Sequence, residues 1–220
     1  MYKSVVKRII DFLGALILLL VLFPVMLIVA ISIKLDSKGP VLFVQKRSGK
    51  GDKIFNMYKF RSMAQDNDVH DFSKENKPTK VGNFIRKTSL DELPQLINIL
   101  KGEMSFIGPR PWIEDYSKYF TKNQKRRLEV LPGITGLAQA KGRNDLSIKE
   151  KINLDIEYVD NLTFIMDIKV IIGTIKTVLS KQGAEISKSG IEDEITELKN
   201  QWNKEKTNKK LNKKTKEKVA

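Results

Sequence analysis

The sequence predicts an α+β fold, mostly helical, that is attached to a membrane through its N-terminal part. Three observations carry this prediction: a long apolar block near the start, two strand-like segments joined by a turn, and two stretches in which apolar residues recur with helical spacing. The chain of 220 residues is long enough for one main domain with a substantial core.

The apolar block runs from Ile9 to Ile33 and carries one charge, Asp11. At ~1.5 Å per residue a helix of this length reaches about 38 Å, which exceeds the ~30 Å hydrocarbon core of a bilayer. Pro24 lies inside the block, where proline removes a backbone hydrogen bond and kinks or breaks a helix. Basic residues flank both ends, and such flanks favour the cytoplasmic side. These features are equally compatible with a kinked spanning helix and with a re-entrant helix that turns at Pro24.

A β-hairpin is predicted after the apolar block. Residues 41–47 and 53–63 are rich in β-branched and aromatic side chains, and the turn sequence SGKG at 48–51 separates them. The polar residues 64–80 predict a mobile loop, and the single histidine, His70, is interpreted as a solvated residue of this loop. The chain has no cysteine, so the chemistry is expected from carboxylates, lysines or hydroxyls.

A short helix with one apolar face is predicted to end at Gly102. Its first residue has two alternatives. Ser89 would form a capping box, but it would place Pro94 in the second turn, where the missing N–H is harmful. With Asp91 as the cap, Pro94 falls in the first turn, and we favour this register. In both registers the adjacent carboxylates Asp91 and Glu92 lie at a helix N-terminus.

A second amphipathic helix is predicted from about Phe164 to Leu179. It is either a core helix or a helix that lies in the membrane interface with its lysines toward anionic headgroups, and the sequence favours neither. From Lys204 to the end, the chain is rich in lysine and nearly lacks apolar residues, which predicts a disordered basic tail.

A net charge of +14 calls for an anionic partner: nucleic acid, an acidic membrane surface or a phosphorylated substrate. The apolar block favours the membrane. No nucleic-acid-binding motif is present, so a membrane-tethered nucleic-acid binder is the weaker alternative and no nucleic-acid partner is expected.

The pair Asp91–Glu92 is the strongest candidate for chemistry because basic residues surround it in sequence. Arg86 and Lys87 precede the pair, and Arg110 follows in a Gly-Pro-Arg-Pro segment. A carboxylate near guanidinium groups is held ionised, and an ionised carboxylate can attack phosphorus. Paired carboxylates also suit Mg²⁺, and arginines bind phosphate in bidentate geometry.

Four motifs occur in order: YKFRSM at 58–63, RKTSLDELPQ at 86–95, MSFIGPRP at 104–111 and PGITGLAQ at 132–139. With them the chain resembles the monotopic phosphoglycosyl transferases of the bacterial sugar transferase family over about residues 1 to 180. At this length it is similar to the small subclass, which includes the enzyme that initiates N-linked protein glycosylation in Campylobacter.

The resemblance implies a re-entrant membrane helix broken at Pro24, although Phe23 stands where the family often has serine. It further implies that Asp91 attacks the β-phosphate of a UDP-sugar, releases UMP and forms a covalent phosphosugar ester. Polyprenol (undecaprenyl) phosphate then accepts the sugar phosphate, in the first membrane step of capsule, exopolysaccharide, O-antigen or glycoprotein assembly. Mg²⁺ is expected as the cofactor, with Asp91 and Glu92 as its ligands and as the catalytic pair.

The same resemblance assigns phosphate binding to four basic residues: Lys59, Arg86, Arg110 and Arg143. It assigns to Pro109 and Pro111, which flank Arg110, a turn that shapes the nucleotide pocket. An inactive scaffold that recruits glycosyltransferases is the alternative from another class, and the intact pair of carboxylates argues against it.

The resulting organisation has three parts: residues 1–38 as the re-entrant helix and its flanks, 39–185 as the catalytic domain, and 186–220 as a charged extension with the Lys-rich tail. Amphipathic interfacial helices are expected around a cytoplasmic active site. The expected location is the bacterial inner (cytoplasmic) membrane, with the catalytic domain on the cytoplasmic face. The expected partners are the UDP-sugar, the polyprenol phosphate, anionic lipid and downstream glycosyltransferases.

Overall fold

The computed structural model of the chain describes residues 2–64, 78–142 and 145–180, together with 196, 198–200, 202–204 and 207. Most of the loop predicted at 64–80, with His70, and most of the Lys-rich tail lie outside these residues. The helices are α1 (Lys7–Asp36), α2 (Lys80–Lys87), α3 (Gln95–Lys101), α4 (Glu114–Ser117), α5 (Leu137–Lys141), α6 (Ile148–Asp160) and α7 (Phe164–Leu179). The strands are β1 (Leu42–Ser48), β2 (Ile54–Phe60), β3 (Ser105–Ile107) and β4 (Gly133–Thr135). Short turns of π- or 3₁₀-helix are η1 (Tyr2–Val6), η2 (Lys50–Asp52), η3 (Leu90–Glu92) and η4 (Gln124–Leu128).

The mostly helical character predicted from the sequence is confirmed for the described residues, which contain two small two-stranded sheets. The predicted hairpin is the antiparallel pair β1–β2, and the helix predicted from Phe164 to Leu179 is α7. Gly102 ends α3 with a φ of 81°, a left-handed conformation that suits glycine. The helices α2, α5 and α6 and the parallel pair β3–β4 are elements that the sequence analysis did not predict.

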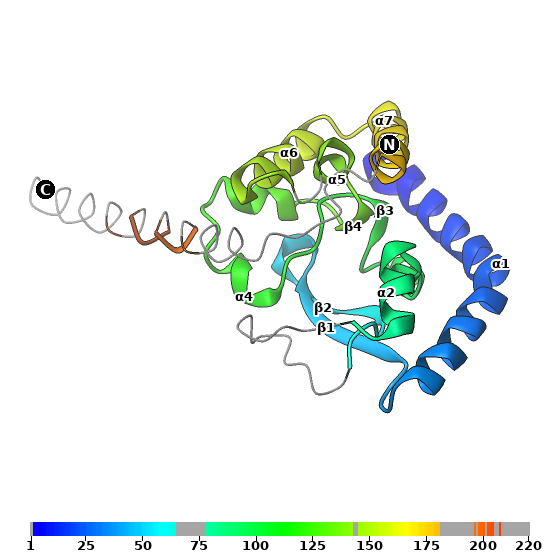
Figure 1. Cartoon of the computed structure of the whole chain (residues 1–220). Helices are drawn as coiled ribbons and strands as arrows, with labels where there is room; N and C mark the ends of the chain where they lie inside the picture. Colours follow the sequence, from blue (N-terminus) through cyan, green and yellow to red (C-terminus); the bar gives the residue numbers. More distant parts are fainter. Residues whose placement is uncertain are drawn as a thin grey trace, which may run out of the picture.

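Helix α1 continues through Pro24 and curves along one side of the body (Figure 1). The structure thus has one uninterrupted helix at Pro24, and the re-entrant path of this helix in a membrane stays a prediction. A proline removes one intrahelical hydrogen bond, and the rest of a long helix absorbs that loss by bending. Within the described part of the chain, α1 is the one helix long and apolar enough to cross a membrane.

Both ends of α1 are attached to the same body. Near the start, Arg8 donates to the carbonyl oxygen of Ile99 in α3 at 2.6 Å. At the other end, the Asp36 carboxylate accepts a hydrogen bond from the backbone N–H of Val81 in α2 at 3.0 Å. Between these anchors the helix exposes large apolar side chains: Ile9, Ile10, Phe12, Leu13, Leu16, Ile17, Leu18, Leu20, Val21, Phe23, Val25, Leu27, Ile28, Ile31 and Leu35. The helix thus lies against the body with its apolar outer face uncovered.

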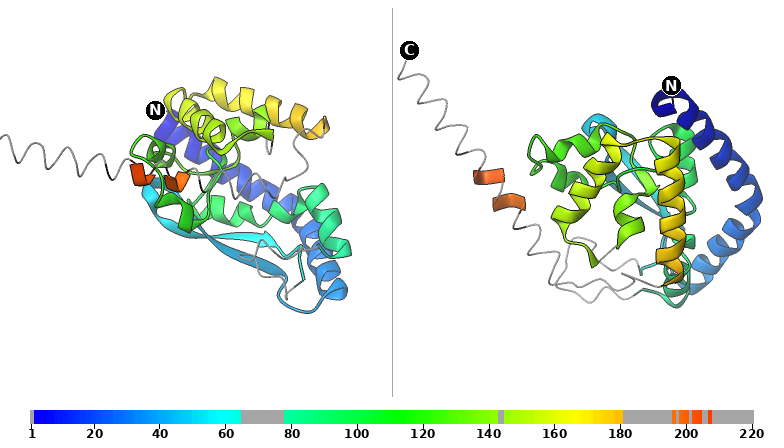
Figure 2. Two further views of the ribbon diagram at one scale, coloured as in Figure 1. Left: turned by 60° about the vertical axis from the view of Figure 1, so that its left-hand side comes forward. Right: turned by 90° about the horizontal axis from the view of Figure 1, so that it is seen from above.

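Helix α7 also leaves an apolar face uncovered. Its large apolar residues are exposed: Phe164, Ile165, Ile168, Ile171, Ile172, Ile175, Val178 and Leu179. Tyr2 packs edge-on against Phe164, so the start of α1 and the start of α7 are neighbours (Figure 2). The core-helix interpretation of this segment is wrong for the exposed face, because only a narrow side of α7, including Val170, is buried.

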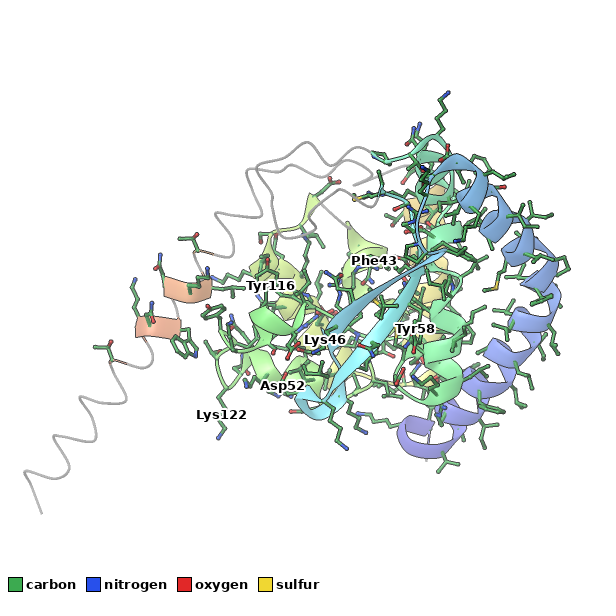
Figure 3. All side chains as sticks on the ribbon, turned by 90° about the horizontal axis from the view of Figure 1, so that it is seen from below. Phe43, Lys46, Asp52, Tyr58, Tyr116 and Lys122 are labelled. Carbon is green, nitrogen blue, oxygen red and sulfur yellow. The ribbon has the colours of Figure 1, made fainter. Side chains whose placement is uncertain are left out.

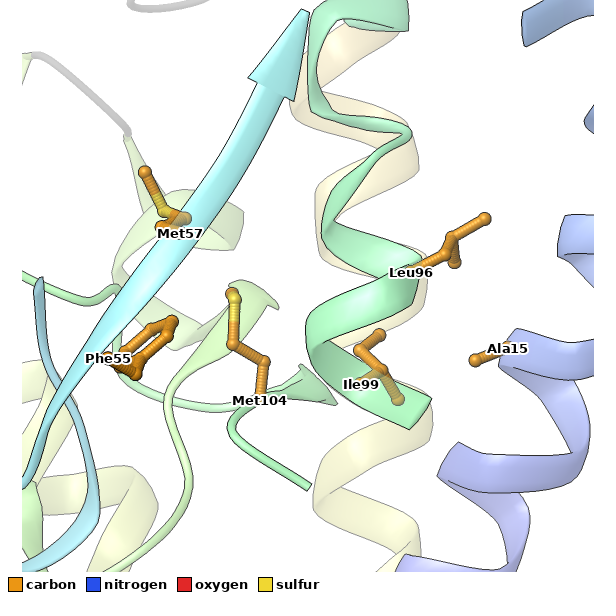
Figure 4. Close-up of a cluster of buried hydrophobic side chains, with 6 residues drawn as sticks. All are labelled: Ala15, Phe55, Met57, Leu96, Ile99 and Met104. Carbon is orange, nitrogen blue, oxygen red and sulfur yellow. The ribbon is translucent and has the colours of Figure 1, made fainter. Parts of the chain in front are cut away.

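Helix α3 lies between α1 and the hairpin, as the buried cluster in Figure 4 shows. Leu96 and Ile99 of α3 pack with Ala15 of α1 on one side and with Phe55 and Met57 of β2 on the other. The small side chain of Ala15 is fully buried, which allows a close approach of α1. This packing fixes the helix that directly follows Asp91 and Glu92.

Asn98 ties α3 to β2 through the backbone. The side chain of this buried residue donates to the carbonyl oxygen of Asn56 at 2.7 Å and accepts from the N–H of Tyr58 at 3.1 Å. A buried amide that satisfies backbone groups of a neighbouring strand fixes the relative position of two elements. The result is that Lys59, the next residue of β2, lies beside the turn η3 that carries Glu92.

Candidate active site

The two carboxylates lie in the 3₁₀ turn η3, between α2 and α3. Ser89 precedes the turn with a φ of 57°, a left-handed conformation that is uncommon for a residue other than glycine. Pro94, without an N–H to donate, occupies the N-cap position of α3. Neither register expected from the sequence is therefore correct, since neither Ser89 nor Asp91 caps α3 with its side chain. A separate turn, and not the first turn of a helix, presents Asp91 and Glu92.

Glu92 is held by two cations. The ammonium of Lys59 donates to Oε1 at 2.7 Å, and Nη2 of Arg110 donates to the same oxygen at 2.9 Å. Burial raises the pKa of Glu92, but the charges of Arg110 and Lys59 outweigh it and lower the pKa to about 2. Glu92 is therefore ionised across the physiological range and serves as the anchor for both basic side chains.

Asp91 is placed differently. Its carboxylate has no hydrogen bond and no ion pair with any other residue that the structure describes. Burial raises its pKa, which Lys59 partly opposes, and the neighbouring charge of Glu92 raises it further. A partly buried carboxylate without hydrogen-bond donors is a stronger nucleophile than a solvated one, because no bond has to be broken before it reacts.

The structure brings Lys59 and Arg110 into contact with Glu92, and their predicted role in phosphate binding stays a prediction. Arg86, at the exposed end of α2, is close enough for its charge to lower the pKa of Asp91. Arg143 lies outside the described residues, so its predicted role stays a prediction.

The turn that carries Arg110 is hydrogen-bonded to the motif at 132–139. Gly133 donates its N–H to the carbonyl oxygen of Pro109 at 3.0 Å, and Gly108 donates to that of Thr135 at 2.9 Å. A Cβ on Gly133 would lie 2.2 Å from the backbone nitrogen of Gly108, so the two chains can approach only with glycine there. The parallel pair β3–β4 thus holds Arg110 in the position from which it contacts Glu92. The two prolines that flank Arg110, Pro109 and Pro111, are buried.

Two further arginines of the site were missed by the sequence analysis. Arg127, from η4, is 1% exposed and donates to the carbonyl oxygen of Arg110 at 2.7 Å. Arg47, from β1, donates to the carbonyl oxygen of Pro111 at 3.2 Å. The sequence carried a signal for Arg47, because strand alternation places it on the face opposite to Lys46. The burial of Arg127 could not be predicted, because it lies in a 3₁₀ turn among other basic residues. Such a turn lacks the 3.6-residue period by which a buried position of an α-helix is identified.

The side chains present fit a magnesium ion only together with a substrate. Among the described residues, no group of three or more His, Asp or Glu side chains could hold a metal ion. Mg²⁺ needs few protein ligands when phosphate oxygens complete its shell. Asp91 offers both carboxylate oxygens, whereas Glu92 offers Oε2, because Oε1 already accepts from two cations.

Comparison with known proteins shows the family to which the chain belongs. The sequence profile of the bacterial sugar transferases matches residues 2–181. The sugar transferase EpsL of Bacillus subtilis is 43% identical over 82% of this chain and 91% of its own length. The undecaprenyl-phosphate galactose phosphotransferase of Salmonella typhimurium is 39% identical over 81% of this chain and 41% of its own length. The undecaprenyl-phosphate glucose phosphotransferase of Komagataeibacter xylinus is also 39% identical, over 81% of this chain and 36% of its own length. The chain therefore spans less than half of these two longer relatives.

Proposed function

The chain belongs to the bacterial sugar transferase family, and from this premise we propose that it transfers a sugar 1-phosphate from a UDP-sugar to polyprenol (undecaprenyl) phosphate. The observation that carries the proposal is the free carboxylate of Asp91 beside Glu92, whose Oε1 binds both Lys59 and Arg110. The names of the relatives support the acceptor and the type of group transferred.

In the proposed mechanism, an oxygen of Asp91 attacks the β-phosphorus of the UDP-sugar. The bond from that phosphorus to the bridging oxygen breaks, UMP leaves with the electron pair, and the sugar phosphate remains as an ester of Asp91. A phosphate oxygen of the polyprenol phosphate then attacks the same phosphorus and releases the carboxylate. Two displacements regenerate the enzyme and form a polyprenyl diphosphate sugar.

The basic residues have defined tasks in this scheme. Arg110 and Lys59 neutralise the charge of an incoming diphosphate, and Arg86 does so on the side of Asp91. Glu92 orients Arg110 and Lys59, since one oxygen accepts from both. When bound, Mg²⁺ supplies Lewis-acid stabilisation of the phosphate charge.

The test of the function is the release of UMP from a panel of UDP-sugars by the full-length protein in detergent or nanodiscs, with and without undecaprenyl phosphate. We expect UMP with at least one sugar, and with the donor alone an initial release of at most about one UMP per enzyme. Failure to release UMP from every donor in the presence of the acceptor would contradict the proposal.

Metal dependence is the next prediction. The attacking carboxylate and the diphosphate are both anionic, so the reaction needs an additional cation at the point of attack. Excess EDTA should stop UMP release and added Mg²⁺ should restore it, whereas Ca²⁺, with its longer bonds and larger shell, should restore it poorly. Full activity in excess chelator would show that the cationic side chains alone suffice.

We also propose that α1 enters the cytoplasmic membrane from the cytoplasmic face and returns to it. Both of its ends contact one body, whereas a spanning helix would carry its start away from that body. The start of α1 lies beside the start of α7, and both helices leave an apolar face uncovered, so both would lie in the same leaflet. This arrangement would place the site at the cytoplasmic surface, where UDP-sugars, the polyprenol phosphate and the next glycosyltransferases meet.

Cysteine labelling tests this topology. Lys3 and Lys38 are exposed on either side of α1, and the chain has no other cysteine to interfere. We expect Lys3→Cys and Lys38→Cys to be protected from a membrane-impermeant thiol reagent in intact cells, and both to react after permeabilisation. Labelling of position 3 from outside would establish a spanning helix and leave the enzymatic proposal intact.

A further inference from the structure

Arg47 lies on the inner face of the hairpin, which is the face that carries Lys59. In the antiparallel register Arg47 is opposite Phe55, and Phe55, Met57 and Lys59 alternate along β2 on one side. Lys46 points to the other side and is exposed. Figure 3 shows the hairpin from below, with Lys46 on β1 and Tyr116 of α4 labelled. Arg47 thus faces the protein body at the end of β1 that adjoins α4.

Among the residues that the structure describes, the guanidinium of Arg47 has neutral hydrogen-bond partners and no anionic one. Nη1 donates to the carbonyl oxygen of Pro111 at 3.2 Å, and Nη2 donates to the side-chain oxygen of Gln45. The buried Nε has no hydrogen-bond partner in the described part of the chain. Among the described residues, no carboxylate forms an ion pair with Arg47. A largely buried cation without a counter-ion is unfavourable unless a ligand supplies the missing charge.

Neighbouring charges make the buried position of Arg47 still less favourable without an anion. Burial lowers the pKa of Arg47, and repulsion from Arg110 adds to this effect, so that the pKa falls to about 10. Glu92 opposes this shift but is itself bound to Lys59 and Arg110. The inner face of the hairpin therefore carries more positive than negative charge at the point where Arg47 and Arg110 approach each other.

We propose that Arg47 and Arg110 together form an anion site for a phosphate group of the substrate, with the unpartnered Nε–H of Arg47 as a donor to that phosphate. The proposal rests on the proposed function, because it assigns a further binding residue to the same site. The ligand chemistry is a phosphate monoester or diphosphate, supplied either by the nucleotide sugar or by the polyprenol phosphate. An arginine that offers Nε–H and Nη–H together binds phosphate oxygens in bidentate geometry.

The first experiment measures binding without turnover. UDP is titrated by calorimetry into the full-length protein in nanodiscs with saturating Mg²⁺, using wild type, Arg47→Gln, Arg47→Lys and the matched control Lys46→Gln. Lys46→Gln removes the same charge from the adjacent residue on the exposed face. We expect Arg47→Gln to weaken UDP binding about tenfold or more, Arg47→Lys to weaken it less, and Lys46→Gln to leave it unchanged.

Steady-state kinetics of UMP release identify the source of the phosphate. A raised KM for the UDP-sugar assigns the site to the nucleotide, and a raised KM for the polyprenol phosphate alone assigns it to the acceptor; both outcomes support the anion site. The inference is overturned if Arg47→Gln leaves UDP affinity and both KM values unchanged. It is equally overturned if Arg47→Gln retains affinity while Arg47→Lys loses it, because binding then does not follow the positive charge at this position.

A measurement on the unmutated protein covers the case in which Arg47→Gln does not fold. In NMR spectra of enzyme with isotope-labelled arginine, the Nε–H resonance of Arg47 is identified as the one that is absent from the Arg47→Lys spectrum. In the unmutated enzyme this resonance should shift when UDP or a short-chain polyprenol phosphate is added. No shift with either ligand would overturn the inference. UMP release by wild type in the same preparation would show that the proposed function stands when this inference fails.

Discussion

Replacing Asp91 by asparagine should reduce UMP release by at least about 1,000-fold, because an amide oxygen is a poor nucleophile toward phosphorus. The fold should remain, since the Asp91 carboxylate makes no hydrogen bond or ion pair with another described residue. Thermal unfolding of the variant should match wild type within a few degrees. Asp160→Asn, which removes an exposed carboxylate paired with Arg126, is the control and should keep full activity.

The pH profile gives a second measurement of the same group. Only the ionised carboxylate attacks, and burial raises the pKa of Asp91, so activity should fall with decreasing pH already above the ordinary value of 3.8. Glu92, with a pKa of about 2, stays ionised through this range and cannot cause the decline. The profile of kcat/KM for the UDP-sugar checks this. Turnover of Asp91→Asn within tenfold of wild type, or a decline only below 3.8, would remove Asp91 from the role of nucleophile.

The fold could be predicted where the sequence has a long regular period. The hairpin follows from two segments of β-branched and aromatic residues around a turn sequence, and α7 follows from apolar residues that recur on one helix face. The pair β3–β4 could not be predicted, because each strand has three residues and pairs with a segment distant in sequence. The turn at Asp91 was placed wrongly because Ser89 adopts a left-handed conformation, which capping rules do not anticipate.

The candidate site also contains residues that could be predicted from the sequence and contacts that could not. Motif resemblance identified Asp91, Glu92, Lys59 and Arg110, and the structure brings the last three together at one carboxylate oxygen. What holds Arg110 in place could not be predicted, because its support comes from buried contacts to backbone carbonyl oxygens. Any side chain with a donor can make such contacts, so they leave no pattern in the sequence.

The second large effect is expected at the buried pair Arg127–Asp155. Arg127 donates from Nε and Nη2 to Oδ2 of Asp155 at 2.9 and 2.5 Å, and both side chains are at most 2% exposed. The guanidinium also lies over the ring of Trp112, 5.0 Å from its centre. Through its bond to the carbonyl oxygen of Arg110, this pair connects α6 to the turn that carries Arg110.

Arg127→Met should therefore destabilise the protein by ~3–5 kcal/mol, because Asp155 is left buried without its cation. Burial already raises the pKa of Asp155, and the loss of Arg127 should raise it further. A raised carboxylate pKa favours the folded state at low pH, so the destabilisation should grow as the pH rises through the folded-state pKa of Asp155. Thermal unfolding of the full-length protein at several pH values measures this.

The double variant Arg127→Met/Asp155→Leu separates the loss of the pair from the loss of the turn. It should recover much of the stability, because no uncompensated charge remains, while UMP release stays low because the carbonyl oxygen of Arg110 has lost its donor. Arg126→Met, at the adjacent exposed position, is the control and should change neither unfolding nor activity appreciably. If the double variant regained activity along with stability, Arg127 would support the fold alone, and the orientation of Arg110 would depend on the β3–β4 pair and Glu92.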